Sequence, residues 1–256
     1  MEHSSLTLFL VATAALAGSL MNSIAGGGTL ITFPALLAIG IPPLTANATS
    51  TVALWPGSLA ALWGYRAELT GARSWAIRFA VPSILGGLAG AGLLLVTPPE
   101  RFEKIVPFLI LGATGLFAAQ GTVMRFVKRH PHEPTGILRP PPNSLLAWQF
   151  VVSVYGGYFG AGMGILMLAA LGLMGLTNIH QMNGLKNWGG MCANVTAAAA
   201  FGISGIVSWP VAGAMAIGAV IGGFTGSRIA QRVPQTWVRR AITTIGFGAG
   251  LWMLVK

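Results

Sequence analysis

The chain has 256 residues, of which 54% are hydrophobic and 8% are charged, and its formal net charge is +10. Soluble domains carry about 25% charged residues, so this composition excludes a water-soluble fold, a disordered chain, collagen and a nucleic-acid-binding protein. A helix needs about 20 apolar residues to cross a bilayer. Runs without Asp, Glu, Lys or Arg reach this length at residues 4–65, 79–99, 105–124, 140–185 and 187–227. The sequence therefore predicts an all-α, polytopic integral membrane protein.

Prolines, glycines and polar residues divide these runs into ten apolar segments in two sets of five. The expected segments are 5–24, 29–41, 46–65, 79–97 and 105–124 in the first set, and 144–161, 164–176, 184–206, 209–227 and 239–255 in the second. Residues 125–143 hold five prolines and several basic residues without periodicity, which predicts a polar linker. We therefore expect a first half at 1–124, the linker at 125–143 and a second half at 144–256.

The two halves have related sequences. A shift of 136 residues places Gly28 on Gly164 and Asn47 on Asn183, and the order of long and short segments also repeats. This pattern predicts two structural repeats. Other glycines recur at the spacing typical of close helix packing, and they are Gly86, Gly87, Gly90, Gly222, Gly223 and Gly226.

Basic residues indicate the orientation of the chain. They occur in the loop at 66–73, in the linker and at 228–240, whereas the loop at 202–208 has none. Because basic loops stay in the cytoplasm, we expect these three regions there, both termini in the periplasm, and inverted repeats with an odd number of crossings each. The pattern leaves open whether the first two segments of each half span fully or form a re-entrant hairpin.

Glycine clusters interrupt the membrane segments at matching positions. The first cluster lies at 26–28 and the second at 156–164. Each glycine costs about 1 kcal/mol relative to Ala within a helix, so broken helices are expected. The free N–H groups at the start of the helix after a break form an anion site.

Polar residues follow each break, and one of them is charged. Lys186 is the one charged residue between Pro140 and Ser227, and the five acidic residues all lie near loops. A buried ammonium is costly without a partner, so a bound anion is the expected partner. The alternative is that Lys186 reaches the outer surface through its flexible stem. The lack of intramembrane acids disfavours a cation pathway.

These features define the candidate substrate site. Backbone N–H groups at the breaks are expected to hold an anionic headgroup, asparagine side chains to donate hydrogen bonds to it, and Lys186 to offset its charge. No metal, cofactor or catalytic group is expected. The candidate residues are Asn22, Gly26, Gly27, Gly28, Thr29, Asn47, Thr49, Ser50, Gly162, Gly164, Asn183, Lys186 and Asn187.

The motifs at 22–28, 46–50 and 160–164, with Pro34 and Gly40, resemble those of the sulfite exporter TauE/SafE family of bacterial membrane transporters. The resemblance covers essentially both halves. It implies a multi-pass protein of the inner membrane that moves a sulfur-containing anion, such as sulfite, sulfoacetate or another organosulfonate, without hydrolysing ATP. We expect a secondary transporter that works by alternating access.

Three other functions share some of these sequence features. A passive anion channel would use the same site, and a membrane scaffold subunit would need the glycines for packing alone. The Gly-Ile-Ser-Gly sequence at 202–205 matches a short motif of rhomboid proteases, but no His follows His180 as that family requires, so no enzyme is expected. The expected partners are a small anion and the lipid bilayer, a homodimer is compatible with the sequence, and the coupling ion and direction stay open.

Overall fold

The computed structural model describes residues 4–24, 26–70, 72–129, 140–173, 176, 178–229 and 235–255. Across these ranges the chain forms eleven helices and no strand, which confirms the predicted all-α class. The helices are α1 (Ser5–Ile24), α2 (Thr29–Ala38), α3 (Pro43–Gly64), α4 (Arg66–Thr70), α5 (Arg73–Val96), α6 (Pro99–Arg129), α7 (Asn143–Tyr158), α8 (Met163–Leu173), α9 (Ile179–Ser204), α10 (Trp209–Ile229) and α11 (Gln235–Val255).

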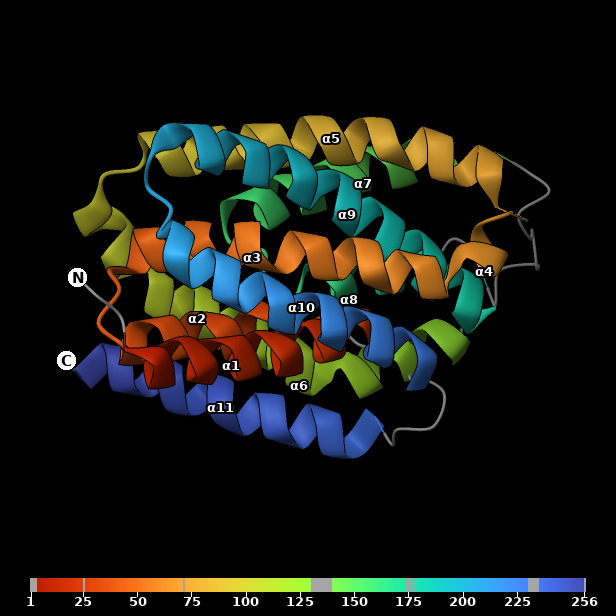
Figure 1. Cartoon of the computed structure of the whole chain (residues 1–256). Helices are drawn as coiled ribbons and strands as arrows, with labels where there is room; N and C mark the ends of the chain where they lie inside the picture. The colour runs from red at the N-terminus through yellow and green to blue at the C-terminus, as the bar shows by residue number, and fades with distance from the viewer. Residues whose placement is uncertain are drawn as a thin grey trace.

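Four helices in the described residues are long and apolar enough to cross a membrane. They are α1, α5, the first part of α6 (Pro99–Ala119) and α10. The helices α3 and α9 are as long but carry the polar residues that follow each glycine cluster. α3 runs through the middle of the bundle, and α9 crosses it obliquely from α4 towards α5 (Figure 1). Their polar side chains therefore face other helices, while the more apolar helices enclose them.

The helices match the ten expected segments, with differences at their ends. α6 continues to Arg129, beyond the expected end at residue 124, because Arg and Lys are good helix formers and a helix need not end at the membrane surface. α9 begins at Ile179 rather than 184, since the side chain of Asn178 accepts hydrogen bonds from the N–H groups of His180 and Gln181. The short α4 was not expected. Residues 130–139 of the expected linker lie outside the described residues.

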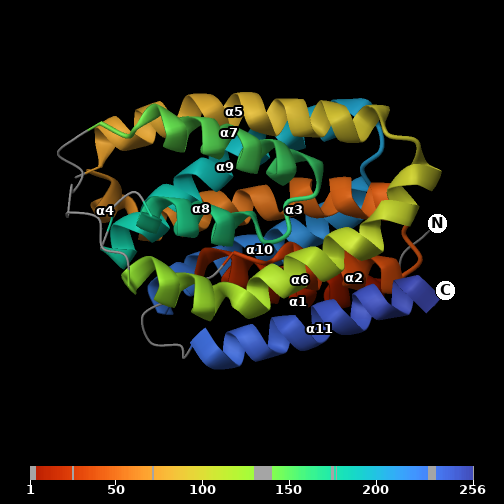
Figure 2. The same ribbon diagram turned by 180° about the vertical axis from the view of Figure 1, so that it is seen from behind.

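The first two helices of each half form a hairpin that returns to the end where it began. α2 turns back beside α1, and α3 begins at the same end of the bundle as α1 (Figures 1 and 2). In the same way α8 turns back beside α7, and α9 begins near the start of α7. With 10 and 11 residues, α2 and α8 are about 15 Å long, which is half the thickness of the hydrocarbon core.

Close contacts between helices join the two halves through glycines. A Cβ on Gly223 of α10 would meet the backbone of Gly57 in α3, and one on Gly87 of α5 would meet the backbone of Ala193 in α9. Residues 57 and 193 are themselves separated by the 136-residue shift. The other glycines of the predicted packing set, Gly86, Gly90, Gly222 and Gly226, approach α7 or α1 just as closely. Their packing role is confirmed.

The ends of the bundle differ in what they contain. Figure 1 shows the start of α1 and the end of α11 at one end, and α4 with the C-terminal ends of α6 and α10 at the other. Arg66 and Arg73 begin α4 and α5, and Arg228 is in the last turn of α10, so these basic residues lie at the end of the bundle opposite the two termini. Arg101 and Lys104 stand in the first turns of α6, at the end that holds the termini, together with Glu100 and Glu103.

Candidate functional site

The two helix breaks contact each other at the centre of the bundle. Gly26 has a φ of 75°, and a Cβ placed on it would lie 2.9 Å from the Cα of Gly164. The N–H of Gly26 donates to Met21 O at 3.2 Å, and the N–H of Gly160 donates to Tyr155 O at the same distance. Each bond spans five residues and closes the last turn of α1 or α7 at a glycine with positive φ. A side chain at Gly26 would push the two breaks apart.

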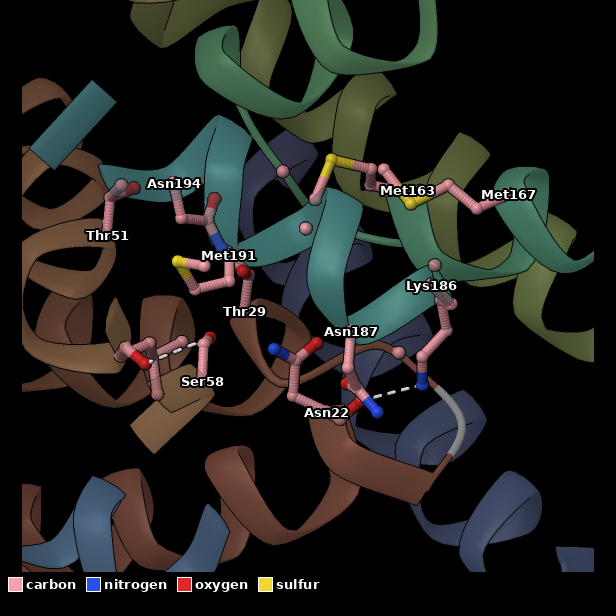
Figure 3. A pocket seen from close by; sticks show the side chains of 15 residues that line it. Asn22, Thr29, Thr51, Ser58, Met163, Met167, Lys186, Asn187, Met191 and Asn194 are labelled. Carbon is pink, nitrogen blue, oxygen red and sulfur yellow. Dashed lines mark hydrogen bonds between the residues drawn. The ribbon is translucent and has the colours of Figure 1, made fainter. Parts of the chain in front are cut away.

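A small cavity lies beside this contact. It has a volume of about 30 Å³, which holds roughly two water molecules. Figure 3 shows side chains from α1, α2, α3, α8 and α9 around it. The lining residues are Asn22, Gly26, Thr29, Thr51, Leu54, Ser58, Gly160, Met163, Gly164, Met167, Lys186, Asn187, Gly190, Met191 and Asn194.

Lys186 is buried at this cavity, with 3% of its surface exposed. Its Nζ donates to the backbone O of Asn22 at 3.1 Å (Figure 3) and to that of Ser23 at 3.3 Å. The side-chain amide of Asn187 donates to the same Ser23 O at 3.4 Å. The end of α1 therefore supplies Lys186 with backbone acceptors that the sequence did not indicate. The alternative, in which Lys186 reaches the outer surface, is wrong.

Lys186 is the one ionisable side chain among the described residues that line the cavity. When protonated it carries a unit charge, which the C-terminus of α1, with about half a negative elementary charge, offsets in part. No carboxylate is among the described residues around the cavity. Thr29 and Gly164 stand in the first turns of α2 and α8, and no described backbone carbonyl pairs with their N–H groups. These positive helix ends favour an anion.

The structure brings six of the predicted site residues together around the cavity. They are Asn22, Gly26, Thr29, Gly164, Lys186 and Asn187. They come from both halves of the chain: Asn22 and Thr29 flank the first break, and Gly164 follows the second. The remaining predicted residues lie elsewhere, in packing contacts between helices.

Three of those residues, all on α3, bond to other parts of the protein. The Nδ2 of Asn47 donates to Tyr158 O at 2.9 Å, at the C-terminus of α7. The hydroxyl of Thr49 accepts from the N–H of Ser208 at 3.0 Å. The hydroxyl of Ser50 lies 2.6 Å from that of Thr32, with which it shares a hydrogen bond. These side chains fix the positions of helices.

The other four predicted residues also lack contact with the cavity. A Cβ on Gly27 would meet the ring of Phe117 at 2.7 Å, and one on Gly28 would meet the backbone of Gly18. Gly162 faces Ala113 of α6. The side-chain oxygen of Asn183 is buried without a hydrogen-bond partner among the described residues. Most glycines at the two breaks therefore allow close contact with other helices.

The polar clusters that follow each break in the sequence include Thr51 and Asn194, but the candidate site contained neither, nor Leu54, Ser58, Gly190 and Met191. Thr51, Leu54 and Ser58 recur at i, i+3 and i+7, and Asn187, Gly190, Met191 and Asn194 at i, i+3, i+4 and i+7. Both spacings mark one face of a helix. Extending the face of Asn187 towards the C-terminus would have found this set. Met163 and Met167 add thioethers from α8, for which the sequence held no comparable signal.

Comparisons with known proteins identify the family of the chain. The family model described as sulfite exporter TauE/SafE matches residues 10–253. A probable membrane transporter protein of Haemophilus influenzae is 31% identical over 236 residues, covering 90% of this chain and 87% of the relative. The probable membrane transporter protein ORF9 of Sinorhizobium is 32% identical over 255 residues, covering 97% and 92%. The probable membrane transporter protein YfcA of Escherichia coli K12 is 26% identical over 250 residues, covering 94% and 87%. The chain therefore belongs to the sulfite exporter TauE/SafE family and is a membrane transporter rather than an enzyme.

Proposed function

We propose that this protein is a secondary transporter that moves a small sulfur-containing anion across the bacterial inner membrane by alternating access. Sulfite, sulfoacetate and other organosulfonates are the proposed substrates, and the cavity at Lys186 is the proposed substrate site. The observation that carries the proposal is a buried lysine beside a cavity with no carboxylate among its described lining residues. The proposal that the substrate contains sulfur rests on the family's description alone.

Lys186 has capacity for a ligand. An ammonium has three N–H donors, and the two bonds to Asn22 O and Ser23 O use two of them. An anion that enters the cavity accepts the third and meets the side-chain amides of Asn187 and Asn194, which also line the cavity. Charge-assisted hydrogen bonds of this kind are about twice as strong as neutral ones. The same arrangement repels a cation.

The cavity is smaller than the proposed substrates, so transport requires it to widen. A volume near 30 Å³ holds roughly two water molecules. The hairpins α1–α2 and α7–α8 meet at Gly26 and Gly164 through backbone atoms, without interlocking side chains. Such a contact can open without changing rotamers. We propose that movement of one hairpin relative to the other exposes the site to each side of the membrane in turn.

We further propose that the two halves are inverted repeats with periplasmic termini. The opposite courses of α1 and α7 in Figure 1 support the inversion. So does the exchange of partners, in which α1 packs on α10 and α7 packs on α5. With the end that contains α4 in the cytoplasm, as the excess of basic residues there favours, both termini face the periplasm.

Ligand-dependent stability tests the site directly. The detergent-purified protein is unfolded by heat with sulfite, sulfate, taurine, sulfoacetate or uncharged dimethyl sulfone. A ligand at 100 times its Kd stabilises the protein by about 2.7 kcal/mol. We expect a rise in Tm with at least one sulfur-containing anion, none with dimethyl sulfone, and no rise in Lys186→Met.

The variant Lys186→Met keeps the length of the side chain and removes its charge. Gln149→Leu is the matched control, because Gln149 is equally buried but bonds to Ser83 and Ser153 away from the cavity. This control should lose intrinsic stability and keep the anion-dependent rise. Equal rises in wild type and Lys186→Met would contradict the site. No rise in Tm with any anion would favour a scaffold role. A carrier and a passive channel are distinguished by transport rates, because the flux through a carrier saturates with substrate concentration.

A further inference from the structure

A second concave region lies apart from the substrate cavity, on the outside of the bundle. It is a groove of about 800 Å³ between α3, α4, α5 and α9, within the size range of ligand sites. Its walls are mostly apolar and include Leu59, Trp63, Ile77 and Trp188. Trp63 is 63% exposed and Ile77 58%. We call this region the α3–α5 groove.

Two arginines line the same groove. Arg66 and Arg73 are both exposed, and no carboxylate occurs among the described side chains that line it. The guanidinium of Arg66 lies over the ring of Trp63, with Cζ 5.0 Å from the ring centroid, and its Nη1 donates to Trp63 O at 3.0 Å. The contact with Trp63 holds one cation at the rim of an apolar surface.

The groove lies at the level of a membrane surface. Arg66 is the first charged residue after the uncharged run at 4–65, and Arg73 begins α5, which is long and apolar enough to cross the membrane. Tryptophans such as Trp63 favour the same interfacial depth. The apolar walls therefore face the lipid tails, and the two guanidinium groups lie where lipid phosphates lie.

We propose that the α3–α5 groove binds an anionic phospholipid, with an acyl chain against Trp63 and Ile77 and the phosphate between Arg66 and Arg73. Because a lipid tail is already in hydrocarbon, moving it into the groove yields little free energy. Selectivity comes from the headgroup, since guanidinium groups bind phosphate through paired hydrogen bonds. A zwitterionic lipid brings its own cation close to the arginines and binds less well.

A second copy of the chain fits the groove less well than a lipid does. A symmetric dimer centred here would use the same patch on both subunits. Such a dimer would bring Arg66 and Arg73 of one subunit close to the same two arginines of the other. Like charges at an interface cost several kcal/mol. The charge of the groove is complementary to a phosphate and not to itself.

The bound lipid would contact helices that also form the substrate cavity. Leu59 follows Ser58 of the cavity on α3, and Trp188 follows Asn187 on α9. The Nε1 of Trp188 donates to Ala76 O of α5 at 2.7 Å. A lipid in the groove therefore stabilises the packing of α9 on α5, and its effect is measurable as stability of the whole chain.

The test measures lipid retention and stability in the full-length protein. The detergent-purified chain is titrated with phosphatidylglycerol or phosphatidylcholine of the same acyl chains, and bound lipid is counted by native mass spectrometry while thermal unfolding is followed in parallel. We expect phosphatidylglycerol to bind at least tenfold more tightly than phosphatidylcholine and to raise Tm. The double variant Arg66→Gln/Arg73→Gln should lose this preference.

Arg78→Gln is the matched control, because Arg78 is exposed on α5 but does not line the groove. It should keep the wild-type preference. If the double variant does not fold, Arg73→Gln alone gives the answer, since Arg73 has no role in holding Trp63. Equal binding of the two lipids, or an unchanged preference in Arg73→Gln and the double variant, would overturn the proposal. Dimers that dissociate on Trp63→Ala, without lipid selectivity, would instead assign the groove to a second copy.

Discussion

The Nζ of Lys186 lies 3.1 Å from the backbone O of Asn22, so a side chain of the second half caps the first helix of the first half. Asn47 does the reverse, because its Nδ2 donates to Tyr158 O at the end of α7. Each hairpin is thus held at its break by the third helix of the other half. The two contacts differ in charge, and the charged one faces the cavity.

Removing the side chain of Asn47, the uncharged of these two caps, should change stability without changing ligand binding. In Asn47→Ala, the half-buried Tyr158 loses the hydrogen-bond donor to its backbone carbonyl, which costs about 1–3 kcal/mol. Asn47 does not line the cavity. We therefore expect a lower Tm with an unchanged anion-dependent rise, measured by thermal unfolding with and without ligand. A variant with unchanged Tm that no longer responds to anions would show that Asn47 contacts substrate after all.

The contact between the two breaks has no room for a side chain. Gly26→Ala would adopt a positive φ, at a cost of about 1–3 kcal/mol, and its Cβ would also press on Gly164. We expect a loss of at least about 2 kcal/mol in stability and a loss of transport. The control is Gly92→Ala on α5, where a Cβ would meet no atom within 4 Å and stability changes by less than about 1 kcal/mol. Similar stability in the two variants would count against the tight contact.

Helix packing between the halves is tested on a single helix. Gly223 and Gly213 both lie on α10, but a Cβ on Gly223 would meet the backbone of Gly57 and one on Gly213 would meet no atom within 4 Å. Gly223→Ala should separate α10 from α3 and destabilise the protein by about 1–3 kcal/mol, as overpacking does. Gly213→Ala should be neutral or slightly stabilising. The comparison uses thermal unfolding, and a reversed order of the two values would refute the packing role.

The cavity residues on α9 give a prediction about affinity. Asn194 lines the cavity, so Asn194→Leu should weaken anion binding several-fold, as expected for the loss of about 1 kcal/mol in one hydrogen bond. Asn178 caps the same helix away from the cavity. Asn178→Ala should lower stability by about 0.5–2 kcal/mol and leave the Kd unchanged. Titration of Tm against anion concentration gives both quantities, and equal Kd values in the two variants would exclude Asn194 from the site.

Most of the helices could be predicted from the sequence, because long apolar runs and glycine clusters determine locally where a helix forms and where it breaks. The segment expected at 5–24 is α1 itself, and 209–227 differs from α10 by two residues. The helices α3 and α9 begin earlier than expected because their first turns are polar or contain proline, which hydropathy alone treats as loop. The direction of the short helices depends on contacts between helices. The sequence pattern therefore could not decide whether these segments cross the membrane or form hairpins.

The site was predicted in part for a similar reason. A lone charge in a long apolar run identified Lys186, and the glycine cluster identified Gly26. The pattern could not place Asn47, whose partner Tyr158 lies in the other half. It also missed the partner of Lys186, because backbone carbonyls become free acceptors only where a helix ends. A search for carboxylates in the sequence does not detect them.

Transport in reconstituted vesicles tests the central claim most directly. Proteoliposomes loaded with unlabelled sulfite are placed in radiolabelled sulfite, and the exchange is followed over a range of concentrations for wild type, Lys186→Met and the control Gln149→Leu, with sulfoacetate and taurine as competitors. We expect saturable exchange in wild type and in the control, and at least a tenfold loss in Lys186→Met reconstituted as a monodisperse protein. Equal exchange in Lys186→Met, or flux that rises linearly without saturation, would contradict an anion carrier whose site is the cavity at Lys186.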